Sequence, residues 1–167
     1  MMLHMLSLVL VLELHNLAGA PPSIVRDAER EVTRVYEDIG VKVDWDHAAD
    51  AEQPAVQVIL LARESGSFRH TPDVMAVAVW TSNGTPAVYV FYRRVEAEAA
   101  RYSVSITFVL AYALVHELGH VLMPDRGHSQ EGLMRAFWNR EDFLRANQGL
   151  LRFLPEQAAL IRARGRN

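Results

Sequence analysis

The 167-residue sequence contains no cysteine. The folded chain therefore has no disulfide bond, no thiolate zinc site and no cysteine nucleophile. Any metal ion that it binds must be held by histidine, aspartate or glutamate side chains, which are the other common metal ligands in proteins.

The sequence also lacks a basic surplus and a long hydrophobic run. Lys and Arg number 17 against 20 Asp and Glu, a formal net charge of −3, so we do not expect nucleic acid as a partner. The apolar stretch 102–115 is uncharged over about 14 residues, whereas a helix needs roughly 20 to cross a bilayer. We expect no membrane span.

Half of the residues are apolar and 22% are charged, a composition typical of globular proteins. The length fits one domain, and no internal repeat or low-complexity segment divides it. We therefore expect a single domain over 1–167, with a sheet and a buried helix in 1–123 and a loop with short C-terminal helices in 124–167.

The N-terminal segment MMLHMLSLVLVLEL has two interpretations. It resembles the apolar core of a secretory signal, with AGA at 18–20 as a small-residue cleavage site. No Lys or Arg precedes the apolar run, however, and Pro21 would follow the cut. We expect instead a first strand from about Ser7 to His15. The sequence does not decide whether the protein is exported.

Alternation of apolar and polar residues predicts further strands at 41–45 and 55–63. The segments 74–80 and 86–95 are predicted to form a hairpin, because Asn83-Gly84 supplies the positive φ angles that tight turns require. About five strands are thus expected, in an order that the sequence does not indicate.

Helical spacing predicts an amphipathic helix over 21–40 that ends at Gly40. From 96 onward helical spacing returns, and 102–123 is apolar on nearly all sides, which is typical of a buried helix. Two short helices are expected at 139–153 and 155–164. We predict an α+β domain: a twisted mixed sheet, a backing helix, a buried helix and a small helical C-terminal part.

His116, Glu117 and His120 form the arrangement H-E-x-x-H on the predicted buried helix. Histidines four residues apart project from one face of a helix, at a separation suited to holding one Zn²⁺ through two ring nitrogens. In this arrangement the metal lowers the pKa of its bound water toward about 7, and the glutamate takes the proton. The motif therefore indicates hydrolytic zinc chemistry.

A catalytic zinc site needs a third protein ligand and an open position for water. His128 is the first candidate because it follows His120 by eight residues, beyond Pro124, which stops the helix, and Gly127, which allows the chain to fold back. Asp125, which is closer to His120 in the sequence, is the alternative that would supply a carboxylate oxygen.

At these residues the chain resembles the metzincin metallopeptidases. That family shares H-E-x-x-H, a turn after the second histidine, a third histidine beyond it and a tight turn whose methionine lies under the metal. The matching residues here are His116, Glu117, His120, His128 and Met134. The resemblance implies a twisted sheet and a backing helix before the zinc-binding helix, and a small C-terminal part after it.

The sequence departs from the usual metzincin spacing at two positions. Met123 stands where the family has glycine, and Arg126 stands where the third ligand is expected. If His128 is the ligand, the connecting loop is two residues longer than in the family, and Gly127 replaces the missing glycine.

We therefore predict a zinc-dependent peptidase in which His116, His120 and His128 hold Zn²⁺ and Glu117 is the general base. The expected substrate is an extended peptide, paired with the strand at 74–80 or its neighbour. Two alternatives remain: a metallopeptidase of the glutamate-ligand type that uses Glu141, and a non-catalytic binding module that zinc only stabilises. Tyr112 is a candidate neighbour of the site, and Trp138 is expected in the core.

Overall fold

The computed structural model describes residues 8–45, 56–64, 66, 70–125 and 127–164. Within these ranges the chain forms one sheet of the strands β1 (Val9–Asn16), β2 (Lys42–Trp45), β3 (Val56–Leu61), β4 (Ala76–Trp80) and β5 (Pro86–Phe91). The helices are α1 (Pro22–Glu37), α2 (Tyr92–Tyr102), α3 (Ile106–Leu122), α4 (Arg140–Asn147) and α5 (Pro155–Arg164). The predicted α+β class is confirmed.

The sheet has the order β2-β1-β3-β5-β4. Parallel pairing joins β1 to β2 and β3, and β3 to β5, whereas β4 is antiparallel to β5. The expected hairpin is thus confirmed, and it places β4 at one edge of the mixed sheet.

Alternate residues of β4 direct their backbone groups to the outer edge of the sheet, away from β5. The bonds Phe91 N–H to Met75 C=O (2.8 Å) and Thr81 N–H to Thr85 C=O (2.9 Å) mark the pairs that bond across the hairpin. Bonded and non-bonded pairs alternate in an antiparallel ladder. Every second residue of β4, starting one position after Met75, therefore directs its N–H and C=O groups away from β5. These residues are Ala76, Ala78 and Trp80.

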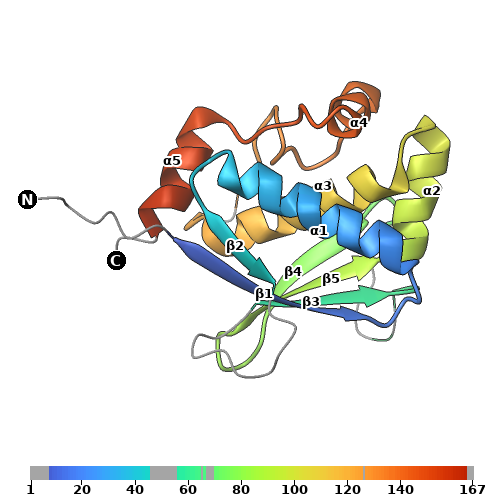
Figure 1. The fold of residues 1–167 in the computed structure, drawn as a ribbon, viewed down its shortest axis with the longest axis horizontal. Helices are drawn as coiled ribbons and strands as arrows, with labels where there is room; N and C mark the ends of the chain where they lie inside the picture. Colours follow the sequence, from blue (N-terminus) through green and yellow to red (C-terminus); the bar gives the residue numbers. More distant parts are fainter. Residues whose placement is uncertain (1–7, 46–55, 65, 67–69, 126, 165–167) are drawn as a thin grey trace, which may run out of the picture.

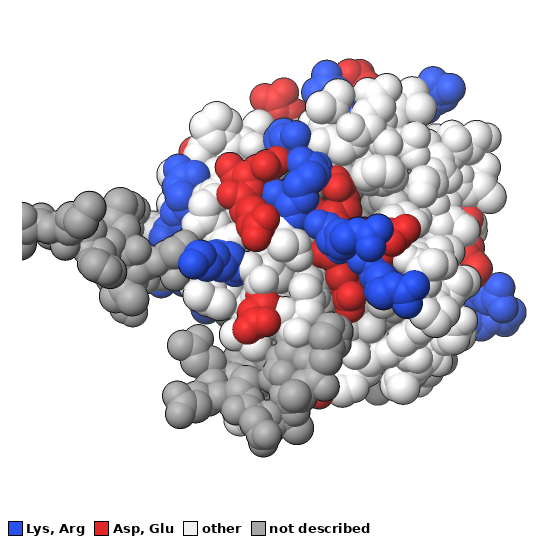
Figure 2. All heavy atoms as spheres, viewed as in Figure 1, with Lys and Arg blue, Asp and Glu red and all other residues white. Residues whose placement is uncertain are grey.

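The helices lie on the same side of the sheet (Figure 1). Helix α1 contacts β2 and α3, and α3 contacts β4 and β5, so α1 is the backing helix that the sequence predicted. Its buried residues lie at helical spacing on one face: Val25, Ala28, Val32, Val35 and Tyr36. On the face seen in Figure 2, acidic and basic side chains intermingle over α1 and do not separate into patches.

Helix α3 is the buried helix that the sequence predicted. Every residue from Val109 to Leu122 is buried except Glu117. No helix in the described ranges has the length and apolarity that a bilayer crossing requires. The helix therefore packs within the protein core and brings its two histidines into the interior.

The expected extent of the last strand was wrong. Strand β5 ends at Phe91 and α2 begins at Tyr92, so 92–95 are helical. Tyr92, Val95 and Ala99 are buried at helical spacing on one face of α2, and this packing overrides the local alternation in VYVFY. Ser103, with φ +55°, ends α2 and separates it from α3.

Candidate metal centre

Three histidine rings converge at the C-terminal end of α3. The Nε2 atom of His120 lies 3.1 Å from Nε2 of His116 and 3.1 Å from Nε2 of His128. Two nitrogens bound to one tetrahedral Zn²⁺ at 2.0–2.1 Å lie about 3.3 Å apart. The three rings therefore form a group that can hold one metal ion.

The local sequence explains how the rings meet. His116 and His120 are one turn apart on α3, so their side chains share a face. Helix α3 ends at Leu122, and Met123 is extended because Pro124 disfavours a helical conformation at the residue before it. The chain then returns toward the helix and places His128 beside His120.

The backbone of 129–134 fixes two of the three histidines that could hold a metal ion. His116 donates its Nδ1–H to the carbonyl of Leu133 (2.9 Å), which leaves the Nε2 lone pair directed at the other rings. Ser129, next to His128, donates its N–H to the carbonyl of Met134 (2.9 Å). The turn at 131–134 thus holds a ligand from α3 and a ligand from the loop.

The Met134 side chain packs against α3 at Gly119, which lies between the two helical histidines in the sequence. It is fully buried, and a Cβ added at Gly119 would come within 2.6 Å of its Sδ atom. Only glycine at 119 allows this approach without displacing Met134. The structure thus places the Met134 sulfur against Gly119, the residue before His120, and the methionine turn stays a prediction.

Burial keeps the imidazole ring of His116 neutral. Its side chain is 8% exposed, and desolvation lowers its pKa to about 3, despite the opposing hydrogen bond to Leu133. A neutral imidazole is the form that binds metal ions. The site therefore needs no deprotonation of His116 at neutral pH before a metal can bind.

Glu117 lies between the histidine group and the edge strand. Burial raises the pKa of its carboxyl group to about 7, and a hydrogen bond from the backbone of Ala78 in β4 opposes this shift. The carboxyl group is thus close to half-protonated at neutral pH. A group with such a pKa can both accept and return a proton.

A cavity of about 550 Å³ opens beside His116, Glu117 and His128. Its walls come from the segment leading into β4, from α2, α3 and α4, and from the chain before α4. The lining includes Ala76, Tyr102, Ala113, Phe137, Trp138 and Phe143. The cavity is therefore largely apolar near the histidines, with a size suited to a bulky side chain.

Neither protein-family models nor curated proteins match this chain. The metzincin resemblance accordingly rests on the motif residues and their spacing.

The alternative ligands lie elsewhere. Glu141, at the start of α4, is exposed and pairs with Arg145 (2.8 Å), and Asp125 accepts a hydrogen bond from the N–H of Gly127. Neither belongs to the group of potential metal ligands found in the part of the chain that is described. Arg126, which stands at the position of the family's third ligand, lies outside the described residues.

Several groups around the site were not predicted. Trp138 was expected in the core, but it is only half-buried, lines the cavity and contacts the His116 ring edge-on. The carbonyl of Leu133 and the N–H of Ala78 are backbone groups, which no side-chain pattern reveals. Tyr112 is fully buried, and its hydroxyl group lies near Arg34 of α1.

Proposed function

We propose that this protein is a zinc-dependent peptidase of metzincin type. The observation that carries the proposal is the convergence of three histidine nitrogens beside a half-buried glutamate, the outer edge of β4 and a cavity. His116, His120 and His128 would hold the zinc ion. When bound, zinc supplies Lewis-acid polarisation and lowers the pKa of water.

Glu117 supplies the proton transfer. With a pKa near 7, one of its carboxylate oxygens takes a proton from the attacking water and later returns that proton to the leaving amine. Its hydrogen bond to the backbone of Ala78 holds the carboxyl group beside β4. Proton transfer therefore takes place next to the strand on which the substrate is proposed to lie.

The substrate would be an extended peptide paired with the outer edge of β4. The N–H and C=O of Ala76 and the C=O of Ala78 face this edge, whereas the N–H of Ala78 is donated to Glu117. An added strand would pair with Ala76 and with the Ala78 carbonyl by main-chain hydrogen bonds. The neighbouring cavity would then receive one substrate side chain. This arrangement aligns a peptide bond with Glu117 without requiring a particular sequence along the whole peptide.

The test is hydrolysis of a broad peptide library by the zinc-loaded protein. We expect cleavage that a chelator abolishes, and loss of at least about 100-fold in turnover for Glu117→Gln, the low end for a general base. Zinc content measured on the same sample should be unchanged, because Glu117 is not a ligand. Turnover retained by Glu117→Gln would disprove the assigned role, and no chelator-sensitive cleavage by the wild type would favour the binding-module alternative.

A further inference from the structure

A polar network joins α1 to the segment that follows α4. Arg34 donates to the carboxylate of Glu31 through Nε (2.9 Å) and Nη2 (2.6 Å), and to Asp38 through Nη1 (2.8 Å). Its Nη2 also donates to the carbonyl of Gly149 (3.1 Å). These contacts hold the pKa of Arg34 above its ordinary value, mainly through the bond to Glu31, so the guanidinium group carries a permanent charge.

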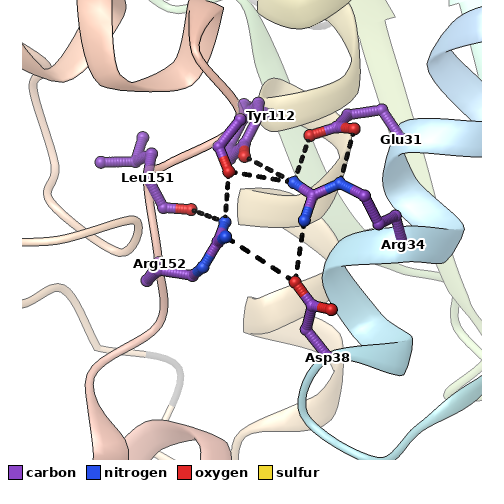
Figure 3. Close-up of polar contacts among 7 residues, drawn as sticks. Glu31, Arg34, Asp38, Tyr112, Leu151 and Arg152 are labelled. Atoms are coloured by element: carbon purple, nitrogen blue, oxygen red, sulfur yellow. Dashed lines mark hydrogen bonds and ion pairs between the residues drawn. The ribbon is translucent and has the colours of Figure 1, made fainter.

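Arg152 completes this network from the other side (Figure 3). Its guanidinium group donates to the carbonyl of Gly149 (2.5 Å) and lies 3.8 Å from the carboxylate of Asp38. Gly149 therefore accepts from two arginines, one on α1 and one on its own segment. The neighbours Leu151 and Phe153 are buried, so residues 149–153 are attached to the protein on both sides.

The same segment contacts the metal centre through its backbone. The carbonyl of Arg152 accepts a hydrogen bond from the N–H of Leu133 (2.8 Å). The carbonyl of Leu133 in turn accepts the Nδ1–H of His116 (2.9 Å). Three consecutive contacts thus connect the carboxylate of Asp38 to a metal ligand.

We propose that Arg152 is a positioning residue for His116, acting through the Leu133 peptide. Its side chain fixes segment 149–152 against α1, and its carbonyl then fixes the peptide group that orients the His116 ring. Hydrogen-bond partners of a ligating histidine set its tautomer and ring orientation, and their loss typically costs about 10–100-fold in metal affinity. The proposal rests on the metal site of the proposed function.

The experiment compares four variants, Arg152→Met, Arg152→Lys, Asp38→Asn and Arg30→Met, with the wild type. The measurements are Zn²⁺ titration and hydrogen exchange of the Leu133 amide in the metal-free protein. Arg152→Met removes the side-chain contacts. Asp38→Asn leaves both arginines in place and weakens the ion pairs of Asp38 with Arg152 and with Arg34, so it carries the test if Arg152→Met does not fold. Arg30→Met is the matched control, because Arg30 lies on α1 and forms an exposed ion pair with Asp27.

We expect Arg152→Met to weaken Zn²⁺ binding by about ten-fold or more and to accelerate exchange at Leu133. Asp38→Asn should change both in the same direction by less, Arg152→Lys should recover part of the loss, and Arg30→Met should change neither. Faster exchange at Leu133 with unchanged Zn²⁺ affinity would give Arg152 a merely structural role and overturn the proposal. An exchange rate at Leu133 equal to that of the wild type in both Arg152→Met and Asp38→Asn would overturn it as well. A wild type that binds no Zn²⁺ would refute the proposed function, and the exchange measurement would still decide whether Arg152 orders Leu133.

Discussion

Glu117 differs from an ordinary surface glutamate because the surrounding protein desolvates its carboxyl group, although the residue as a whole is only half-buried. In the folded protein its pKa is about 7, whereas the ordinary value is 4.5. Between these two values the folded state binds more protons than the unfolded state, so this group lowers stability as the pH rises. Above pH 7 the carboxylate is charged in both states, and its destabilising contribution to the free energy of unfolding has reached its full size.

The substitution Glu117→Gln should therefore stabilise the metal-free protein at neutral and higher pH. The gain should be absent near pH 4.5, grow up to about pH 7 and then stay constant. It should reach no more than about 3.5 kcal/mol, since one pKa unit corresponds to about 1.4 kcal/mol. Urea unfolding of both proteins from pH 4.5 to 8 measures it.

His116 acts in the opposite direction and serves as the internal control. Its pKa falls from 6.5 to about 3 on folding, so it makes both proteins less stable as the pH falls below 6.5. This loss is common to the two proteins and cancels in their difference. A stability difference that does not vary with pH would show that the Glu117 carboxyl group is not perturbed by burial.

At this scale the sequence predicted the side chains but not their backbone partners. Histidines four apart on a helix must share a face, so His116 and His120 could be placed from spacing alone. The carbonyl that orients His116 belongs to Leu133, and the N–H beside Glu117 belongs to Ala78. Every residue except proline carries such an N–H, and every residue carries such a carbonyl, so only the folded chain reveals which ones are used.

Strand β4 is the element on which the proposed substrate binding depends. Its outer edge presents the backbone groups of Ala76, Ala78 and Trp80, and in the described residues no other strand pairs with that edge. Proline is tolerated on an edge strand where the N–H faces outward. A proline at such a position removes one donor while the bonds to β5 remain.

We expect Ala76→Pro to raise the KM for a cleaved peptide about five-fold, which corresponds to one lost hydrogen bond of about 1 kcal/mol. The value of kcat should change little, because Ala76 is not expected to contact the reacting atoms. Steady-state kinetics measure both constants, and Ala76→Ser, which keeps the N–H, is the control. Equal KM values for the two variants would argue against main-chain pairing at this position.

Among the helices and strands, the sequence was misleading at the junction of β5 and α2, where strand alternation and helical spacing overlap. The strand alternation in VYVFY continues into residues that belong to α2, and the buried spacing of Tyr92, Val95 and Ala99 decides for the helix. Helix α3 was simpler to predict, because an apolar surface on all sides over this length is compatible with a buried helix.

For the molecule as a whole, metal binding should appear as stability. Anything that binds only the folded state stabilises it, by about 2.7 kcal/mol at a free concentration 100 times the dissociation constant. We expect Zn²⁺ to raise the thermal unfolding temperature of the wild type and of Glu141→Ala, because Glu141 is exposed and paired with Arg145. His128→Ala should show a much smaller rise.

Differential scanning calorimetry with and without Zn²⁺ tests this expectation, with each metal-free variant as its own baseline. A full rise for His128→Ala and a lost rise for Glu141→Ala would support the glutamate-ligand alternative in place of His128.

The order of the strands was not predictable from the sequence. It depends on pairings between residues far apart, such as Leu12 with Val56 and Gln57 with Ala87, and several orders bury the same apolar faces. The three ligands, by contrast, lie within 13 positions of the chain, from His116 to His128. Local spacing therefore carried most of the information about the site and little about the sheet.

The exposed edge of β4 also bears on how the protein behaves in concentrated solution. An unpaired strand edge can recruit a strand from another molecule, and natural proteins usually protect such edges with charge, proline or a bulge. The β4 segment AVAVW has none of these residues. The surface proposed to receive a peptide is thus also the place where self-association would begin, and a bound peptide would act as a protective cap against it.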